Sequence, residues 1–466
     1  MTTASITLAN SDLAIPIEKG LPIVGCLPEM AKDPIQFFKR LTKAYPDCVE
    51  FKIPLARLAL ITSADLSHQI LVKENSRFRK ADRDMKIMGS LLGTGLVTNN
   101  NHDSHKIQRK MVQPGFHFRR IQGYADIMAD YSQRYLKDWG DKGTRDISDD
   151  MFRLTMYIVS KTLFDTDKED LSDESNQIGL AVHEFQNIAD SRFHQIFHSP
   201  EWLPTRRNLK IKKIRSFLNA TMRTIISKRT DDEGNISERG DLLSMLLNAE
   251  YEDGSKMTED QLLDELITLF IAGHETTSNA LTWTFYLIAK HPEIQEKLYA
   301  ELDLVLGDTP PSFKDLESLT YTEMVIKESM RILPPVWTLN CRQANEDMVL
   351  GNYHIPKDKI FFIAPAANHF NPEYFPDPER FDPERFTAEN EKKLPRFAYI
   401  PFGGGPRVCI GNSFAMMEAK LILATFVQQY KITLDPKQAI EPQPQITLSN
   451  KGGMSVNYEK RKQISA

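Results

Sequence analysis

One long helix signal, from Thr258 to Pro292, constrains the fold more than any other part of this sequence. Thr258 with Gln261 forms a capping box, which predicts a helix start, and Pro292 predicts the helix end. A helix over residues 259–290 would be roughly 48 Å long at 1.5 Å per residue, which is enough to cross a whole domain. Residues 266–273 are apolar almost all round, so we expect this helix to be buried on several sides.

The apolar stretch leads into a short polar string, Ala-Gly-His-Glu-Thr-Thr at residues 272–277. A small pair that leaves room beside the backbone is followed by an acid–alcohol pair, Glu275 and Thr276. One interpretation is a polar break in a core helix, in which the Thr276 hydroxyl bonds to a carbonyl of its own helix. A zinc protease is excluded, because His-Glu-x-x-His from His274 would need a second histidine where Ser278 stands.

A single cysteine lies in a glycine-rich turn near the C-terminus, in the order Phe-x-x-Gly-x-Arg-x-Cys-x-Gly from Phe402 to Gly411. At average residue usage this pattern would arise at roughly one start position in ten million. Residues 412–426 are good helix formers, so Cys409 precedes a helix N-terminus, which favours its thiolate. One interpretation is a buried structural cysteine. The other is a thiolate ligand for haem iron, which favours splitting of the O–O bond.

The turn around Cys409 resembles the haem-binding signature of the cytochrome P-450 superfamily, and the resemblance extends from about Ile17 to Tyr458. It implies haem b (iron protoporphyrin IX) with Cys409 as the axial ligand. Arg407 would then pair with a haem propionate, and Phe402 would pack beside the sulfur.

The string at 272–277 resembles the oxygen-activation motif of the same superfamily. The resemblance implies that Thr276 hydrogen-bonds dioxygen at the iron and that Glu275 relays protons from solvent, which is general-acid catalysis by positioned groups.

A second capping box, Thr320 with Glu323, predicts a helix that ends at Leu333. Glu328 and Arg331 are spaced i and i+3, so both project from one face of that helix. Taken alone, such a pair is usually a solvated surface pair. The superfamily instead uses a Glu-x-x-Arg pair as a buried structural element.

Further basic residues receive roles from the resemblance. The family partner of Glu-x-x-Arg is an arginine in a later Pro-Glu-Arg-Phe segment, and Arg385 is preferred over Arg380 because of its distance to the cysteine turn. His105 and Arg109, one helical turn apart, and Arg342 are candidate donors to a haem propionate. Each of these three is alternatively an ordinary surface base.

The substrate pocket is the least constrained part of the site. By resemblance its walls are the loop 93–98, the segment 185–197, the central helix, the run after Pro335 and the turn 447–448, with Val97, Ile271, Ala272 and Leu448 as candidate residues. These residues are apolar or small, so we expect a hydrophobic, lipid-like substrate such as a fatty acid, retinoid or terpenoid. The motifs are nearest to the fatty-acid-hydroxylating branch, in which Arg57 would pair with a carboxylate. A surface arginine on a strand is the alternative.

The predicted fold class is mainly α with a smaller β lobe, the cytochrome P-450 fold, with haem between the long central helix and the Cys409 loop. β-rich pieces are predicted around 49–61, 348–362 and 432–458. The predicted organisation is a flexible segment 1–16, one haem-thiolate domain over 17–458, and a polar tail 459–466.

Composition excludes some function classes. A net charge of −5 with 26% charged residues argues against a nucleic-acid partner. Four cysteines without a Cys-x-x-Cys pair suit a reducing cytoplasm. Because no apolar run of about 18 residues lies near the N-terminus, we expect no transmembrane anchor and a soluble, bacterial-type, cytoplasmic protein.

The resemblance implies a haem-thiolate monooxygenase that uses dioxygen to hydroxylate or epoxidise a hydrophobic small molecule. No flavin or NAD fingerprint follows residue 458, so we expect electrons from a ferredoxin or flavodoxin with its NAD(P)H-dependent reductase; Lys420 is a candidate docking contact. One alternative is a peroxide-driven or isomerising haem enzyme, against which Glu275 and Thr276 argue. Another is a non-enzymatic haem-binding sensor.

Overall fold

A computed structural model describes residues 14–194, 200, 202–229 and 241–461. The chain forms two compact units. The first unit contains the chain up to Asp84 together with Trp337–Glu379 and Leu394–Val408. The second contains Met85–Val336, Arg380–Lys393 and the chain from Cys409 onward. Most residues of the predicted terminal segments 1–16 and 459–466 lie outside the described ranges. The first two residues of the predicted tail, Glu459 and Lys460, belong to strand β12 (Ser455–Lys460).

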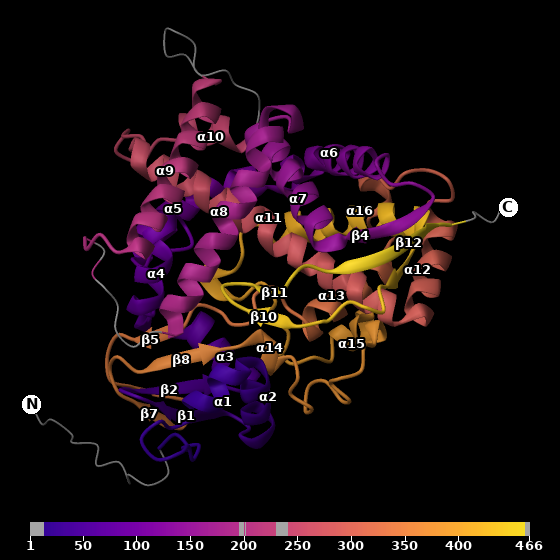
Figure 1. Cartoon of the computed structure of the whole chain (residues 1–466). Coiled ribbons are helices and arrows are strands. Elements are labelled where there is room, and N and C mark those ends of the chain that lie inside the picture. Colours follow the sequence, from indigo (N-terminus) through magenta and orange to yellow (C-terminus); the bar gives the residue numbers. More distant parts are fainter. Residues whose placement is uncertain (1–13, 195–199, 201, 230–240, 462–466) are drawn as a thin grey trace, which may run out of the picture. The chain divides into compact units, whose positions relative to one another are not determined.

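The first unit is built on a five-stranded sheet in the order β1-β2-β8-β5-β3 (Figure 1). Strand β2 pairs with β8 in parallel, and the other neighbours are antiparallel. The strands and helices of this unit are β1 (Cys48–Ile53), β2 (Ala56–Ile61), β3 (Phe78–Lys80), β5 (Arg342–Ala344), β6 (Met348–Leu350), β7 (Tyr353–Ile355), β8 (Ile360–Ile363), α1 (Leu27–Lys32), α2 (Pro34–Ala44), α3 (Ala64–His68) and α14 (Pro365–Asn368).

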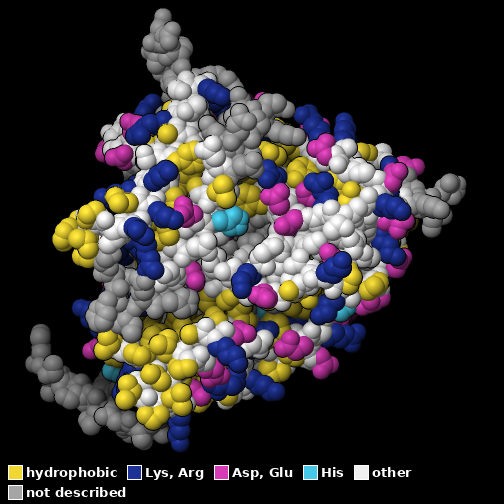
Figure 2. Space-filling view, in the orientation of Figure 1, with side chains coloured by type: hydrophobic (Ala, Val, Ile, Leu, Met, Phe, Trp, Pro, Cys, Tyr) yellow, Lys and Arg dark blue, Asp and Glu magenta, His cyan; other side chains and the backbone are white. Residues whose placement is uncertain are grey.

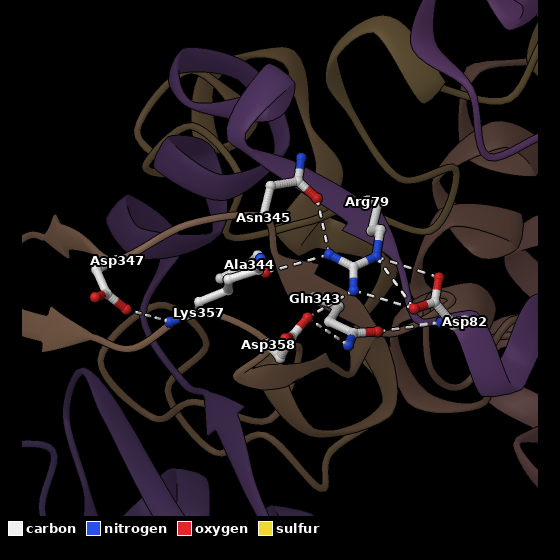
Figure 3. A network of polar contacts seen from close by, with 8 residues as sticks. All are labelled: Arg79, Asp82, Gln343, Ala344, Asn345, Asp347, Lys357 and Asp358. Atoms are coloured by element: carbon white, nitrogen blue, oxygen red, sulfur yellow. Dashed lines mark hydrogen bonds and ion pairs between the residues drawn. The ribbon is translucent and has the colours of Figure 1, made fainter.

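A polar network around Arg79 ties β3 to β5 in the first unit (Figure 3). Its guanidinium donates to Asp82 at 3.0 Å, to Asp358 at 2.7 Å and to the Asn345 side chain at 2.9 Å. Asp358 also accepts a hydrogen bond from Gln343 at 3.1 Å. The network therefore fixes β5, the strand that begins with a candidate propionate ligand.

The second unit is organised around α11 (Glu259–Lys290), a helix of 32 residues. The Thr258 hydroxyl caps its first turn by accepting from the Gln261 amide, so the predicted helix start and end are confirmed. Its neighbours in the unit include α7, α9, α13 and α16, which is why apolar residues occur on nearly all of its faces.

The helices of the second unit surround α11, and a three-stranded sheet in the order β4-β12-β9 lies in the same unit (Figure 1). The elements of this unit are α4 (Asp82–Leu92, which begins in the first unit), α5 (His102–Val112), α6 (Phe118–Leu136), α7 (Ile147–Phe164), α8 (Lys168–His194), α9 (Arg206–Ser227), α10 (Leu242–Asn248), α12 (Pro292–Val305), α13 (Thr320–Ile332), α15 (Ala388–Glu391), α16 (Asn412–Gln429), β4 (Lys142–Asp146), β9 (Tyr430–Leu434), β10 (Pro442–Pro444), β11 (Leu448–Asn450) and β12 (Ser455–Lys460). The predicted fold class, mainly α with a smaller β portion, is confirmed.

The predicted capping box at the start of α13 is wrong. Thr320 is the first helical residue, and no side-chain cap comes from the residue before it. The Glu301 carboxylate of α12 accepts the free backbone N–H of Thr322 at 2.8 Å and also that of Tyr321. A carboxylate from a neighbouring helix thus replaces the local cap.

Large apolar side chains remain on the surface of the first unit. Figure 2 shows hydrophobic side chains gathered over the β1–β2 hairpin at the lower left. Leu55, at the turn of that hairpin, is 80% exposed. Within the described ranges, none of the helices combines the length and the apolar character that crossing a membrane requires.

Candidate active site

Cys409 lies just before α16 and is accessible to solvent, yet burial raises the pKa of its thiol. Protein atoms therefore surround the sulfur, although the residue as a whole is accessible. A backbone hydrogen bond at Gly411 and the positive charge of Arg109 both lower the thiol pKa. Burial has the largest effect, so the net shift of the thiol pKa is upward. A metal on the sulfur would deprotonate it outright.

Arg109 and His105 both lie on α5 in the second unit. Arg109 is half-buried, and Cys409 is the charge that acts on it, opposing the effect of burial on the Arg109 pKa. His105 is buried. The structure therefore brings Arg109 near the cysteine, as a cation beside a sulfur that carries negative charge when it binds metal.

Three cationic side chains converge in the first unit. Arg342 of β5 and Arg407 each have a pKa lowered to about 10, mainly by burial, and Arg342 also acts on Arg407. Lys80 of β3 has a pKa lowered well below its usual value by burial and by both arginines. Asp84 is the acid that faces Arg342. A cluster of this kind is suited to a dianionic group such as a pair of carboxylates.

The glycines of the cysteine turn are required by its geometry. Gly405 has φ +67°, and a Cβ there would collide with the backbone carbonyl of Leu71. Gly403 has φ +70° but more space around it. Phe402, in the same turn, is half-buried. Phe402 and Arg407 belong to the first unit and Cys409 to the second, so the packing of Phe402 beside the sulfur stays a prediction.

The middle of α11 has one open face. Ala272 is exposed, and Ile271 and Thr276 are partly exposed, although the helix on either side is buried. The Thr276 hydroxyl donates to the Ala272 carbonyl at 2.9 Å, the bond expected of a polar break in a core helix. These three residues therefore form a partly exposed stripe on an otherwise buried helix.

Glu275, the residue before Thr276 on α11, is buried. Burial raises the pKa of its carboxyl to about 7, and a hydrogen bond from Thr447 partly opposes the shift. The Thr447 hydroxyl donates to Glu275 Oε1 at 2.5 Å, and the Gln186 amide donates to the same oxygen. Glu275 is therefore a neutral acid below about pH 7 and is able to hold a proton.

Glu328 and Arg331 of α13 form a fully buried ion pair, and Arg385 adds a second guanidinium at 3.4 Å. The backbone N–H of Asp382 donates to the same carboxylate at 2.9 Å. Arg380 contributes only its carbonyl, which accepts from Arg331 at 3.1 Å. The later copy of the Pro-Glu-Arg-Phe string thus supplies the side chain.

The pocket candidates lie in several segments of the second unit. Val97 is half-buried in the loop between α4 and α5. Leu448 is fully buried, with its N–H donating to Pro335 and its carbonyl accepting from Trp283, both at 2.8 Å. Of the segment 185–197, residues 195–197 lie outside the described ranges.

Two basic residues do not fit the roles expected for them. Arg57 of β2 has a side chain 67% exposed and forms an ion pair with Glu50 at 3.5 Å. It behaves as a surface arginine on a strand. Lys420 is buried and donates to Glu323 at 2.9 Å, so its expected role as a docking contact is wrong.

Sequence reasoning missed Lys80, Gln186 and Glu418. Glu418 of α16 is completely buried, and within the described part of the chain neither carboxyl oxygen has a hydrogen-bond partner of good geometry. Burial raises its pKa well above the usual value, and the Thr277 hydroxyl opposes the shift. The one signal available was an acid within an apolar helical run; nothing local marks Lys80 or Gln186.

The residues present fit a haem group. In the second unit, the Cys409 sulfur with the Arg109 cation acting on it suits a thiolate ligand. In the first unit, taken by itself, the cluster of Lys80, Arg342 and Arg407 suits two propionates.

Comparison with known proteins agrees with this geometry. The family model described as Cytochrome P450 matches residues 15–457. Cyclooctat-9-en-7-ol 5-monooxygenase of Streptomyces melanosporofaciens is 34% identical over 418 residues, which cover 88% of each chain. Pentalenene oxygenase of Streptomyces avermitilis is 31% identical over 425 residues, 91% of this chain and 92% of that protein. Cytochrome P450 4V2 of Homo sapiens is 28% identical over 473 residues, 96% of this chain and 89% of that protein.

Proposed function

Because the chain belongs to the cytochrome P450 family and is a haem-dependent monooxygenase, we propose a specific role for each of its site residues. Cys409 would be the protein ligand of the haem iron. Arg109, His105, Arg342 and Arg407 would hold the haem propionates, and Lys80 is added to this set. The bound haem supplies the redox chemistry that activates dioxygen.

The observation that carries the ligand assignment is the solvent-accessible Cys409 thiol just before α16, on which the positive charge of Arg109 acts. The reduced carbon monoxide complex tests it. A Soret band displaced far to the red is expected from a thiolate ligand. A band in the ordinary histidine–haem position would overturn the assignment.

Glu275 is proposed as the proton donor for oxygen activation, with Thr276 as the hydroxyl that orients dioxygen. A general acid works best when its pKa is near the working pH, and the Glu275 carboxyl has a pKa of about 7 because it is buried. The test is Glu275→Gln: reductant consumption should continue while product yield falls and peroxide accumulates. Unchanged coupling between reductant and product would overturn the assignment.

We propose a terpenoid substrate. Two relatives act, by their names, on cyclooctat-9-en-7-ol and pentalenene. The fatty-acid alternative loses support because Arg57 already pairs with Glu50 on the surface. Substrate-induced spectral shifts with cyclic terpenes and with fatty acids distinguish the two. A shift with fatty acids alone would reverse the assignment.

The type of haem, the electron donor and the cellular location of the protein are proposed from features of the sequence. The sequence lacks Cys-x-x-Cys-His, which favours non-covalent haem b over covalently attached haem. A ferredoxin or flavodoxin with its reductase is proposed as the electron source. Four cysteines without disulfides suit the cytoplasm. The family match over 15–457 supports one functional domain over 17–458.

A further inference from the structure

A polar cluster in the second unit surrounds the Glu275 carboxyl. Its members are Gln186 of α8, Glu275 and Asn279 of α11, and Thr447 just before β11. Gln186, Glu275 and Thr447 are each at least 94% buried. Three segments far apart in the sequence therefore place hydrogen-bonding groups on one buried acid.

The hydrogen bonds fix the direction of the Thr447 hydroxyl. Its oxygen accepts from the Asn279 amide at 3.1 Å and from the Gln186 amide at 3.4 Å. A hydroxyl has two acceptor positions and one hydrogen, so both acceptor positions are filled. The single hydrogen therefore goes to Glu275 Oε1, 2.5 Å away.

Both donors reach the same oxygen of the acid. Gln186 donates to Glu275 Oε1, the atom that also accepts from Thr447. In a neutral carboxylic acid, one oxygen accepts and the other carries the proton. With Oε1 occupied by two donors, the proton lies on Oε2.

Glu275 is the acid of this cluster, and its pKa lies near neutrality. Burial and the Thr447 hydrogen bond are the two causes of its pKa shift. His274, the residue before Glu275 on α11, has a pKa lowered to about 4, mainly by burial, and so is neutral near pH 7; His183 of α8 also acts on it. Glu418 of α16 faces Thr277 and is neutral as well.

We propose that Thr447 and Gln186 are positioning residues for proton delivery: by occupying Oε1 of Glu275 they place the transferable proton on Oε2. The inference rests on the proposed role of Glu275 as proton donor. Thr447 and the region of Gln186 belong to segments predicted to line the substrate pocket. A substrate that displaces either side chain would remove a hydrogen-bond donor from Glu275 Oε1 and so change where the proton lies.

The decisive variant is Thr447→Val, which removes the hydroxyl and keeps the shape. The hydroxyl stabilises the carboxylate, so its loss raises the Glu275 pKa further. A hydrogen bond to a charged group contributes about 1.5–3 kcal/mol, so the pH midpoint of coupling should move upward by about one to two units. At a pH below both midpoints, where Glu275 is protonated in either protein, peroxide release should rise several-fold because the proton is no longer held on Oε2. Gln186→Met should change the pH midpoint of coupling and the peroxide release in the same direction. Thr447→Ser keeps the hydroxyl and should leave both at their wild-type values.

Thr284→Val is the matched control. Thr284 lies on α11, the helix of Glu275, but its hydroxyl donates to the Ala280 carbonyl and not to the acid. The pH midpoint of coupling should therefore stay at the wild-type value. Infrared difference spectroscopy gives a readout that does not depend on turnover. The carboxyl stretch that disappears in Glu275→Gln should move to higher frequency in Thr447→Val, because the accepting oxygen loses a donor.

The outcomes separate the two levels of the proposal. If Glu275→Gln impairs coupling but Thr447→Val and Gln186→Met leave both the pH midpoint and the carboxyl band unchanged, the positioning role is wrong and the donor role stands. If Glu275→Gln leaves coupling unchanged, the donor role fails and the positioning role fails with it. Should Thr447→Val not fold, Gln186→Met alone decides.

Discussion

Arg331 and Glu328 form a bidentate ion pair from which solvent is completely excluded. Arg331 Nε lies 2.6 Å from Glu328 Oε2, and Nη2 lies 2.8 Å from Oε1. Both side chains are 0% exposed. Spacing along α13 brings the two together, whereas Asp382 and Arg385 arrive from a distant segment to complete the set.

Removing one partner of this pair should be severely destabilising. Glu328→Gln leaves the Arg331 guanidinium buried without its countercharge, which costs about 3–5 kcal/mol. Urea unfolding of the purified protein measures the loss. The control is Glu389→Gln, which breaks an exposed pair with Lys393 and should change stability by less than about 1 kcal/mol. Equal losses in the two variants would contradict a structural role for the buried pair.

Cys409→Ser should abolish the red-displaced carbon monoxide band and reduce haem content. A hydroxyl is a far weaker iron ligand than a thiolate, because it does not ionise near neutral pH. The pyridine haemochrome assay and the reduced carbon monoxide spectrum measure both effects. Cys26→Ala removes a buried thiol of the first unit and should leave the band in place. A normal band in Cys409→Ser would show that another residue binds the iron.

Glu418 should make the stability of the protein fall as the pH rises. Its folded-state pKa lies well above the usual value, so the native chain retains a proton that the unfolded chain releases. Between the unfolded and folded pKa values, stability falls by up to about 1.4 kcal/mol per pH unit. Glu418→Gln should remove that slope, as measured by urea unfolding from pH 5 to 8. Glu317→Gln, at an exposed position, should retain it. Parallel profiles for wild type and Glu418→Gln would contradict this expectation.

Gly405→Ala should be far more damaging than Gly403→Ala. Both positions have positive φ, which costs an alanine about 1–2 kcal/mol. At Gly405 the new methyl group also meets the Leu71 carbonyl, a backbone atom that has no rotamer to escape into. Thermal unfolding and haem content check the difference. Similar behaviour of the two variants would mean that the turn relaxes away from Leu71.

Local features of the sequence were enough to predict α11 and the strand-rich regions. The capping threonine, the apolar run and the terminal proline all act within a few residues of one another, so the helix 259–290 is predicted correctly. The glycines before Cys409 are required by positive φ and a close backbone approach, which a motif records. Glu328 and Arg331 meet because i and i+3 share a helical face.

Contacts between segments far apart in the sequence had no local signal that could predict them. Glu301 caps α13 from another helix, and Gln186 with Thr447 reaches Glu275 across the fold. Burial is a property of the packed chain, so only the tertiary structure decides that the pKa of the Cys409 thiol is raised and that Lys420 is unavailable for docking. The sequence by itself determined the family, the long helix and the ligand turn, because those follow from local geometry. The tertiary structure decided the electrostatics of the site, because desolvation and charge interactions depend on which remote side chains become neighbours.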